Sequence, residues 1–253
     1  MRDKGHNFLR VYRIIEYVAA APRPVSYAEI SDELALPKPT THRLCELLIE
    51  QAILQRDPDG RCFIPGQRLR TLALEVLGGN GLAAERRLVL QSLSRRTGET
   101  CNLTVPDGTS VLYLDRVETE WPLRIAFPVG SRVPLHCTAS GKLYLSQMAT
   151  RERRRLLAAL ELEPSTRNTI IDADRLAEEL AVTRERQYGI DNEEFLDGMI
   201  AVAVPVHDPQ GRICATIAIH GPVQRFTLDR ALSHLPLMRD AAASLEATLR
   251  SGA

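Results

Sequence analysis

The chain has 253 residues, of which 44% are hydrophobic and 25% charged, so it can form the cores of one large domain or two ordinary ones. No apolar run approaches the roughly 18–20 residues that span a bilayer, and the charged N-terminus argues against a secretion signal; we therefore expect a cytoplasmic protein with no membrane partner. The 32 Lys and Arg residues balance 32 Asp and Glu residues, so any surface that binds nucleic acid must owe its positive charge to a local cluster.

The N-terminal part of the sequence predicts three helices. Apolar residues recur every three or four positions from Asn7 to Ala20, which indicates an amphipathic helix. Ser26 and Glu29 have the spacing of a capping box, which predicts the start of a second helix. Pro39 suits the first turn of a third helix, because a helix does not need the amide hydrogen of that position.

A β-hairpin is expected after the third helix. Strand-like segments at 53–56 and 61–64 flank residues 57–60, whose Asp, Pro and Gly are typical of a turn. Three helices followed by a hairpin have the order of a winged helix-turn-helix, which we assign to residues 1–66. A further amphipathic pattern predicts a linker helix at 67–80.

The third helix has the residue types of a DNA-reading helix. A helical wheel places Leu44, Leu47 and Leu48 inward, and the opposite face carries cations, a hydroxyl and His42. Such a face suits the major groove, where His42 could contact a base edge and Glu46 could accept from a cytosine amine. The residues expected to contact DNA are Ser26, Lys38, Pro39, Thr40, Thr41, His42, Arg43 and Glu46, with Arg56 and Arg61 at the wing. Taken singly each could be an ordinary surface residue, so the prediction depends on the ordered set.

The rest of the chain predicts a second domain of the α+β class. Four residues at 78–81, three of them glycine, interrupt the helical pattern. Hairpin patterns follow at 103–117 and 202–219, with helical patterns between them and a last helical region at 228–249. Hairpins alternating with helices favour an antiparallel sheet covered by helices, which we assign to residues 81–253 as a sensor domain.

Five segments of this sequence resemble the IclR-type family of bacterial transcriptional regulators. They are Ala35–Leu48, Gly130–Lys142, Tyr188–Phe195, Gly198–Pro205 and His220–Pro222. The resemblance implies a winged helix-turn-helix, a linker helix and a GAF-like effector domain. It also implies homodimers formed through the DNA-binding domains and assembly into tetramers. One recognition helix covers only a few base pairs, so we expect a pseudo-palindromic double-stranded operator with two half-sites. We expect no cofactor.

The resemblance also implies an effector pocket. Its positions in this sequence are Ile125, Val133, Ala139, Ser140, Asp191, Met199, Ala201, Ala218 and His220. Family members often have small hydroxyl residues where this chain has Ala218 and His220, and several have a cysteine where it has Ala201. We therefore expect a ligand held differently from glyoxylate or pyruvate.

The residues themselves favour a small organic acid as the effector. Thr138–Gly141 opens a helix with small residues, whose free amides can hold a carboxylate. His220 ends a strand and can act as a donor, and small apolar residues leave room for an aromatic or aliphatic body. Other interpretations remain: His220 can be a structural histidine, Asp191 can cap a turn, and Met199 can belong to a core.

An enzyme and a metal sensor are the alternatives. Ser140 and His136 lie close in sequence, but the Gly-x-Ser-x-Gly motif of hydrolases is absent, so we expect no catalytic residue. A metal-responsive regulator would recruit His136, Cys137, Cys214 and His220, which lack a compact ligand spacing. The five cysteines contain no Cys-x-x-Cys pair, so neither a zinc ribbon nor a disulfide framework is expected.

Overall fold

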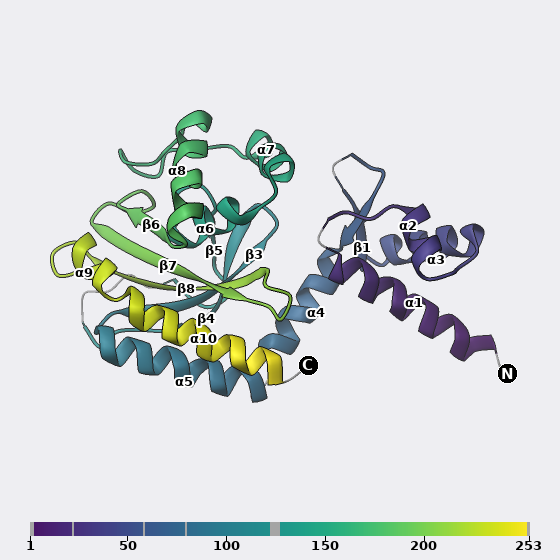
Figure 1. The fold of residues 1–253 in the computed structure, drawn as a ribbon, viewed down its shortest axis with the longest axis horizontal. Coiled ribbons are helices and arrows are strands. Elements are labelled where there is room, and N and C mark those ends of the chain that lie inside the picture. The colour runs from purple at the N-terminus through teal and green to yellow at the C-terminus, as the bar shows by residue number, and fades with distance from the viewer. Residues whose placement is uncertain (1–2, 22, 58, 79, 122–126, 252–253) are drawn as a thin grey trace. The chain divides into compact units, whose positions relative to one another are not determined.

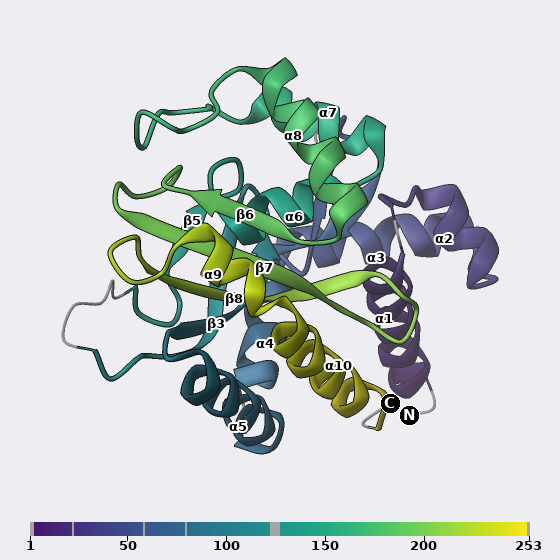
Figure 2. The ribbon, with the colours of Figure 1, turned by 60° about the vertical axis from the view of Figure 1, so that its left-hand side comes forward.

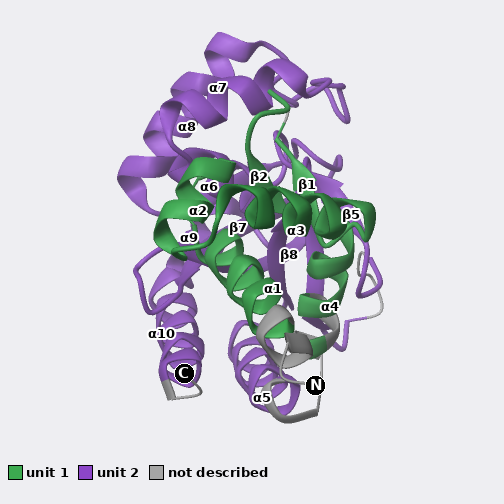
Figure 3. Ribbon diagram, turned by 90° about the vertical axis from the view of Figure 1, so that its right-hand side faces the viewer, with its two compact units in different colours: residues 1–79 green, residues 80–253 purple. Residues whose placement is uncertain are grey.

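A computed structural model describes residues 3–21, 23–57, 59–78, 80–121 and 127–251. The chain forms two compact units, Met1–Gly79 and Asn80–Ala253 (Figure 3). Within the described residues, no helix is both long and apolar enough to cross a bilayer.

The first unit has the expected order of helices and strands (Figure 1). Its elements are α1 (Asp3–Ala20), α2 (Tyr27–Glu33), α3 (Lys38–Glu50), β1 (Leu54–Arg56), β2 (Phe63–Pro65) and α4 (Gln67–Gly78). The β1–β2 hairpin is antiparallel, and Val25 pairs with Phe63 beside it. Ile14, Ile30, Leu44 and Phe63 are fully buried in a core that joins the three helices to the hairpin.

Local chemistry determines the two helix boundaries of the helix-turn-helix. The capping box before α2 is confirmed: the Ser26 amide donates to Glu29 Oε2 at 2.8 Å, and the Glu29 amide donates to Ser26 Oγ at 3.4 Å. Ala35, after the end of α2, has a φ of 50°, in the left-handed region that commonly ends helices. Ser31 Oγ closes the turn by donating to the Leu36 carbonyl at 2.7 Å.

The second unit is an antiparallel six-stranded sheet with helices on both faces, which confirms the α+β class (Figure 2). Its strands are β3 (Thr100–Asp107), β4 (Ser110–Val117), β5 (Arg132–Pro134), β6 (Gly189–Asn192), β7 (Met199–His207) and β8 (Ile213–Pro222). They lie in the order β5-β4-β3-β8-β7-β6. Both predicted hairpins are present, as β3–β4 and β7–β8, and the short edge strands β5 and β6 were not predicted.

The two faces of this sheet differ because side chains alternate along each strand. On one face Leu103, Val202 and Ile219 are buried against α5 (Asn80–Thr97) and α10 (Leu235–Ser251). These two helices lie side by side under the sheet (Figures 1 and 2). The predicted C-terminal helical region is divided, with α9 (Leu228–Ser233) preceding α10.

The opposite face carries small and polar side chains and is covered by α6 (Ala139–Gln147). Beyond α6 lie α7 (Thr150–Ala159) and α8 (Ala173–Arg186) (Figure 1). Gly141 in α6 and Gly189 in β6 allow close contact, because a Cβ atom at either position would overlap the backbone of Leu135 or Ala139. This close packing fixes the start of α6 above the sheet.

Candidate nucleic-acid interface and ligand cavity

The exposed face of α3 carries most of the residues predicted to contact DNA. Lys38, Pro39, His42 and Arg43 are exposed, and Thr40 is half-buried. Because α3 has no acidic residue in its first turn, the start of this face is locally positive. It therefore has the charge that a phosphate backbone requires.

The core-facing side of α3 is rotated relative to the prediction. Thr41, predicted to contact DNA, is fully buried, whereas Leu47, predicted to be buried, is 45% exposed. The buried side is formed by Thr41, Leu44, Cys45 and Leu48, which follow the helical period. Burying the Thr41 hydroxyl costs little, because it donates to the Pro37 carbonyl at 3.3 Å. Thr41 is therefore a core residue, and its prediction as a DNA contact was wrong.

Two residues predicted as separate DNA contacts are bound to each other. Arg56 of the wing donates to Glu46 of α3 at 2.5 Å, and it also donates to the Gly60 carbonyl at 3.1 Å. The Tyr27 hydroxyl donates to the same Glu46 carboxylate. Since one Glu46 oxygen already accepts from both groups, Glu46 is less available to a cytosine amine than its sequence position suggested.

The remaining predicted contacts lie beside these residues. The Asp57 carboxylate shapes the wing turn by accepting from the amides of Arg61 and Cys62 at 3.1 and 2.9 Å, which leaves the Arg61 side chain exposed. The Ser26 side chain is occupied by its capping box with Glu29. Tyr27 was not singled out from the sequence, although its neighbour Ser26 marks the helix start.

In the second unit, strand pairing brings the predicted pocket residues together. Asp191, Ala201, His220 and Thr100 are register partners across β6, β7, β8 and β3, and Ala218 pairs with Asn102. A small cavity lies between this row and the start of α6. Its lining residues are Asn102, Tyr113, Val133, Thr138, Ala139, Ser140, Asp191, Phe195, Met199, Ala201, Ala218 and His220. Ile125 lies outside the described residues.

The cavity encloses about 20 Å³, which is room for about one water molecule. Ligand pockets for small molecules usually measure about 300–1,000 Å³. An organic ligand would therefore have to displace lining side chains, and the aromatic residues Tyr113 and Phe195 are the largest of these.

Hydrogen-bonding groups converge on this cavity from the sheet and from α6. The Asn102 amide lies 3.0 Å from His220 Nδ1, and Asn102 Oδ1 is buried with no hydrogen-bond partner among the described residues. The Thr138 hydroxyl caps α6 by accepting from the Gly141 amide at 3.1 Å. The Ser140 hydroxyl accepts from Thr216 at 2.8 Å, so it anchors the helix to the sheet.

Asp191 is the carboxylic acid in the lining of this cavity. Its Oδ1 accepts from the amides of Glu194 and Phe195 at 2.8 and 3.2 Å, so it caps a turn as the sequence allowed. Burial raises the pKa of Asp191 to about 7, and the nearby Glu194 carboxylate adds to this shift, while Lys142 opposes it. Lys142 is itself buried and ion-paired with Glu194. Near neutral pH, Asp191 can therefore be either a hydrogen-bond donor or an anion.

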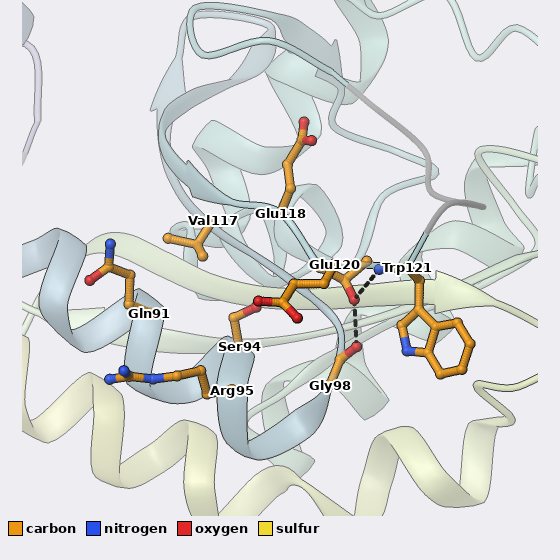
Figure 4. Close-up of a pocket in the computed structure, with 9 residues that line it drawn as sticks. Gln91, Ser94, Arg95, Gly98, Val117, Glu118, Glu120 and Trp121 are labelled. Carbon is orange, nitrogen blue, oxygen red and sulfur yellow. Dashed lines mark hydrogen bonds between the residues drawn. The ribbon is translucent and has the colours of Figure 1, made fainter.

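A larger open groove of about 690 Å³ lies elsewhere, between the end of α5 and the end of β4 (Figure 4). Its labelled side chains, among them Arg95, Glu118 and the 55%-exposed Trp121, spread along the groove rather than converging on one point. The Arg225 guanidinium lies 5.3 Å from the Trp121 ring centroid and binds the buried Glu99 carboxylate. None of the residues predicted to bind a ligand lines this groove, so the small cavity is the better candidate.

The four residues that a metal sensor would recruit have different partners. His136 contacts the Glu163 carbonyl, Cys137 contacts Ser165, Cys214 contacts the Val206 carbonyl and His220 contacts Asn102. In the part of the chain that the structure describes, no group of three His, Cys, Asp or Glu side chains could hold a metal ion. Burial also raises the pKa of the Cys137 thiol to about 12, which disfavours the thiolate that binds metal.

Comparisons with known proteins match both units to the same family of regulators. Residues 9–58 match the family described as the IclR helix-turn-helix domain, and residues 74–247 match the bacterial transcriptional regulator IclR C-terminal family. A probable transcriptional regulator of Cupriavidus necator, SauR, is 47% identical over 234 residues, which are 92% of this chain and 93% of that protein. The transcriptional repressor IclR of Escherichia coli is 29% identical, over 87% of this chain and 81% of the repressor.

A solved structure extends the similarity to the fold. The crystal structure of the Thermotoga maritima IclR aligns with a TM-score of 0.64 and 29% identity, covering 96% of this chain and 98% of that one. The families and relatives reported above are transcriptional regulators, which confirms the prediction that the chain is not an enzyme.

Proposed function

The chain belongs to the IclR family of bacterial transcriptional regulators with a helix-turn-helix DNA-binding domain, and from this we propose that a small organic acid controls its binding to a specific operator. We assign residues 1–66 to DNA binding, 67–80 to a linker helix and 81–253 to effector binding. The observation that carries the proposal is the convergence of buried polar groups from β3, β6, β8 and α6 on one cavity.

The DNA arm of the proposal rests on the exposed face of α3. Lys38 and Arg43 present cations for phosphate, and His42 lies between them on the same exposed surface. Arg61 at the wing adds an exposed cation for the adjacent backbone. One such helix covers only a few base pairs, so we propose two half-sites in a pseudo-palindrome, bound by a homodimer or a tetramer.

The cavity chemistry supports an acid as the effector. Residues 138–140, at the start of α6, line the cavity, and the positive end of the helix dipole favours a carboxylate there. His220 and Asn102 add polar groups that can orient the ligand. Val133, Met199 and the cavity alanines provide an apolar lining for an aromatic or aliphatic body.

Asp191 would repel a nearby carboxylate if it were ionised. Its pKa of about 7 removes this objection, because the neutral acid can instead donate a hydrogen bond to the ligand. Binding of an anionic ligand beside neutral Asp191 takes up a proton above pH 7. We therefore expect the affinity for the acid to fall as the pH rises through 7.

One experiment tests both parts of the proposal, operator binding and control by an organic acid. A DNA duplex is selected from a randomised pool by the wild-type protein, and small organic acids are screened for those that raise the thermal unfolding temperature. A stabilising acid should change the affinity for the selected duplex. Ala201→Phe, whose ring is larger than the cavity and takes the space that a ligand would need, should abolish this response while DNA binding remains.

The matched control is Ala177→Phe, a change of the same size at an exposed position of α8. It should retain the response to the acid. Wild-type ligand affinity by calorimetry in both Ala201→Phe and His220→Ala would contradict the assignment of this cavity.

A further inference from the structure

Tyr27, the first residue of α2, contacts the exposed face of α3. Its ring stacks on the ring of His42, with the centroids 4.7 Å apart and the planes inclined by 11°. The same ring meets Phe63 of β2 edge-on, at 4.5 Å. Tyr27 therefore lies between the core of the wing and the side chain best placed to contact a base.

The hydroxyl of Tyr27 extends these contacts to the wing. It donates to the Glu46 carboxylate and accepts from the Arg56 guanidinium at 3.2 Å. Arg56 also lies over two aromatic rings, 5.9 Å from the centroid of Tyr27 and 5.5 Å from that of Phe63. Stacking, hydrogen bonding and cation–π contact thus hold three side chains of α3 and the wing around one tyrosine.

We propose that Tyr27 is a positioning residue that sets the sequence discrimination of α3. It does so by fixing the side chain of His42 before DNA arrives. The inference rests on the proposed function, because it assumes that α3 reads the operator. Side chains that are already ordered lose less conformational entropy on binding. This smaller loss raises the affinity only for duplexes whose bases match the fixed geometry of the side chains.

This arrangement separates two kinds of contact on one helix. Lys38 and Arg43 are exposed, and the proposed function assigns them to phosphate, which is contacted irrespective of sequence. His42 is stacked on Tyr27 and is the side chain that responds to the base pairs. Glu46 holds the tyrosine hydroxyl and Arg56 in place. Loss of the tyrosine should therefore lower the preference for the operator and leave non-specific affinity unchanged.

Tyr27→Leu tests the proposal, because leucine retains apolar contact with Phe63 but cannot stack or donate. The measured quantity is the ratio of affinities for a duplex selected by the wild-type protein and for a scrambled duplex of the same composition. We expect this ratio of affinities to fall about tenfold. The dependence of the affinity for the scrambled duplex on salt concentration should not change. Tyr27→Phe, which preserves the ring stack, should restore most of the ratio.

A double-mutant cycle tests whether Tyr27 acts through His42. His42→Ala should cost less specificity in Tyr27→Leu than in the wild type, because its ring is no longer held. Tyr17→Leu is the matched control: Tyr17 is half-buried against the same core from α1, so its loss should lower stability without changing the ratio.

Two results would overturn the inference alone: an unchanged ratio in Tyr27→Leu, or an equal loss of affinity for both duplexes, as a purely structural role predicts. A wild-type protein that selects no duplex would instead overturn the proposed function, and this inference with it.

Discussion

At the scale of single residues, the same buried carboxyl group has a structural and a chemical role. Asp191 holds the turn after β6 through two amides and at the same time faces the cavity. Burial without a direct cationic partner makes its ionised form unfavourable. Glu194, in the turn that Asp191 caps, is paired with Lys142 of α6, and both affect the Asp191 pKa although neither lines the cavity.

Asp191 should make stability depend on pH in a defined direction. Its folded pKa of about 7 exceeds its ordinary value of 3.8, so between these values the folded state binds more protons than the unfolded state. The free energy of unfolding should therefore fall by a few kcal/mol as the pH rises from about 4 to about 7, and this component should stay constant above 7. In Asp191→Asn, the free energy of unfolding measured with denaturant should fall less over this pH range. An equal dependence of that free energy on pH in the two proteins would contradict the raised pKa of Asp191.

Two neighbouring residues of α3 should have different effects on DNA binding. Arg43→Ala should weaken binding to selected and scrambled duplexes alike and reduce the salt dependence, because it removes a phosphate contact. His42→Ala should reduce only the preference for the selected duplex, by about 1–3 kcal/mol. Gel-shift titrations at several salt concentrations measure both, and unchanged affinity in both variants would contradict the role of α3.

At the scale of elements, the helix-turn-helix turn contains a residue in a costly conformation. Ala35 adopts a φ of 50°, which disfavours any side chain with a Cβ atom. Ala35→Gly should raise the free energy of unfolding by about 0.5–1 kcal/mol, because the relief of strain exceeds the added freedom of the unfolded chain.

Ala28→Gly provides the comparison, since Ala28 is exposed within α2. It should lower the free energy of unfolding by up to about 1 kcal/mol. Calorimetry of the two variants should therefore give shifts of opposite sign, and a loss of stability in Ala35→Gly would show that the turn is not strained.

Helices and hairpins that are marked by their own residues could be predicted from the sequence. Short strands that exist only because they pair with a neighbouring strand could not. The β7–β8 hairpin was expected because its turn, at Asp208–Gly211, has characteristic residues. Strands β5 and β6 have three and four residues and exist through pairing with β4 and β7, so no periodic pattern revealed them. The rotated core face of α3 was missed because a leucine at 47 resembles a core residue more than a threonine at 41 does.

The same distinction applies to the cavity. The resemblance to a known family placed residues such as Asp191 and His220 in one pocket, and the strands bring them together. Asn102, Tyr113 and Phe195 were not foreseen, because only strand register and side-chain orientation direct them to the same space. Nothing local in the sequence around these three residues distinguishes a cavity lining from an ordinary core.

At the scale of the whole molecule, exposed apolar residues on α1 and α4 support the proposed self-association. Phe8 and Tyr12 on α1 are 68% and 50% exposed, and Leu72 and Val76 on α4 are 55% and 64% exposed. Large apolar side chains that lie one helical turn apart on a helix surface are typical of helix–helix contacts. A second copy of the chain would bury these side chains. It would also supply a second α3 helix for the other half-site of the operator.

Analytical sedimentation at micromolar concentration should therefore show a dimer or a larger assembly. Leu72→Lys combined with Val76→Lys should weaken the assembly and the affinity for a two-half-site duplex, because the charges cannot be buried without partners. Val182→Lys, at a 51%-exposed position of α8, is the control and should change neither. A wild-type protein that remains monomeric with and without DNA would contradict the proposal.

The alternation of side chains in the second unit has a consequence for how such a regulator can diverge. Along β7 and β8 the residues at Ala201, Ala218 and His220 face the cavity, while their neighbours Val202 and Ile219 pack under α5 and α10. Substitutions on one face alter the shape and polarity of the cavity with little effect on the core on the other. Under the proposed function, an evolving lineage or a designed library can therefore change which effector is bound by substituting the cavity positions, without losing the core that supports the sheet.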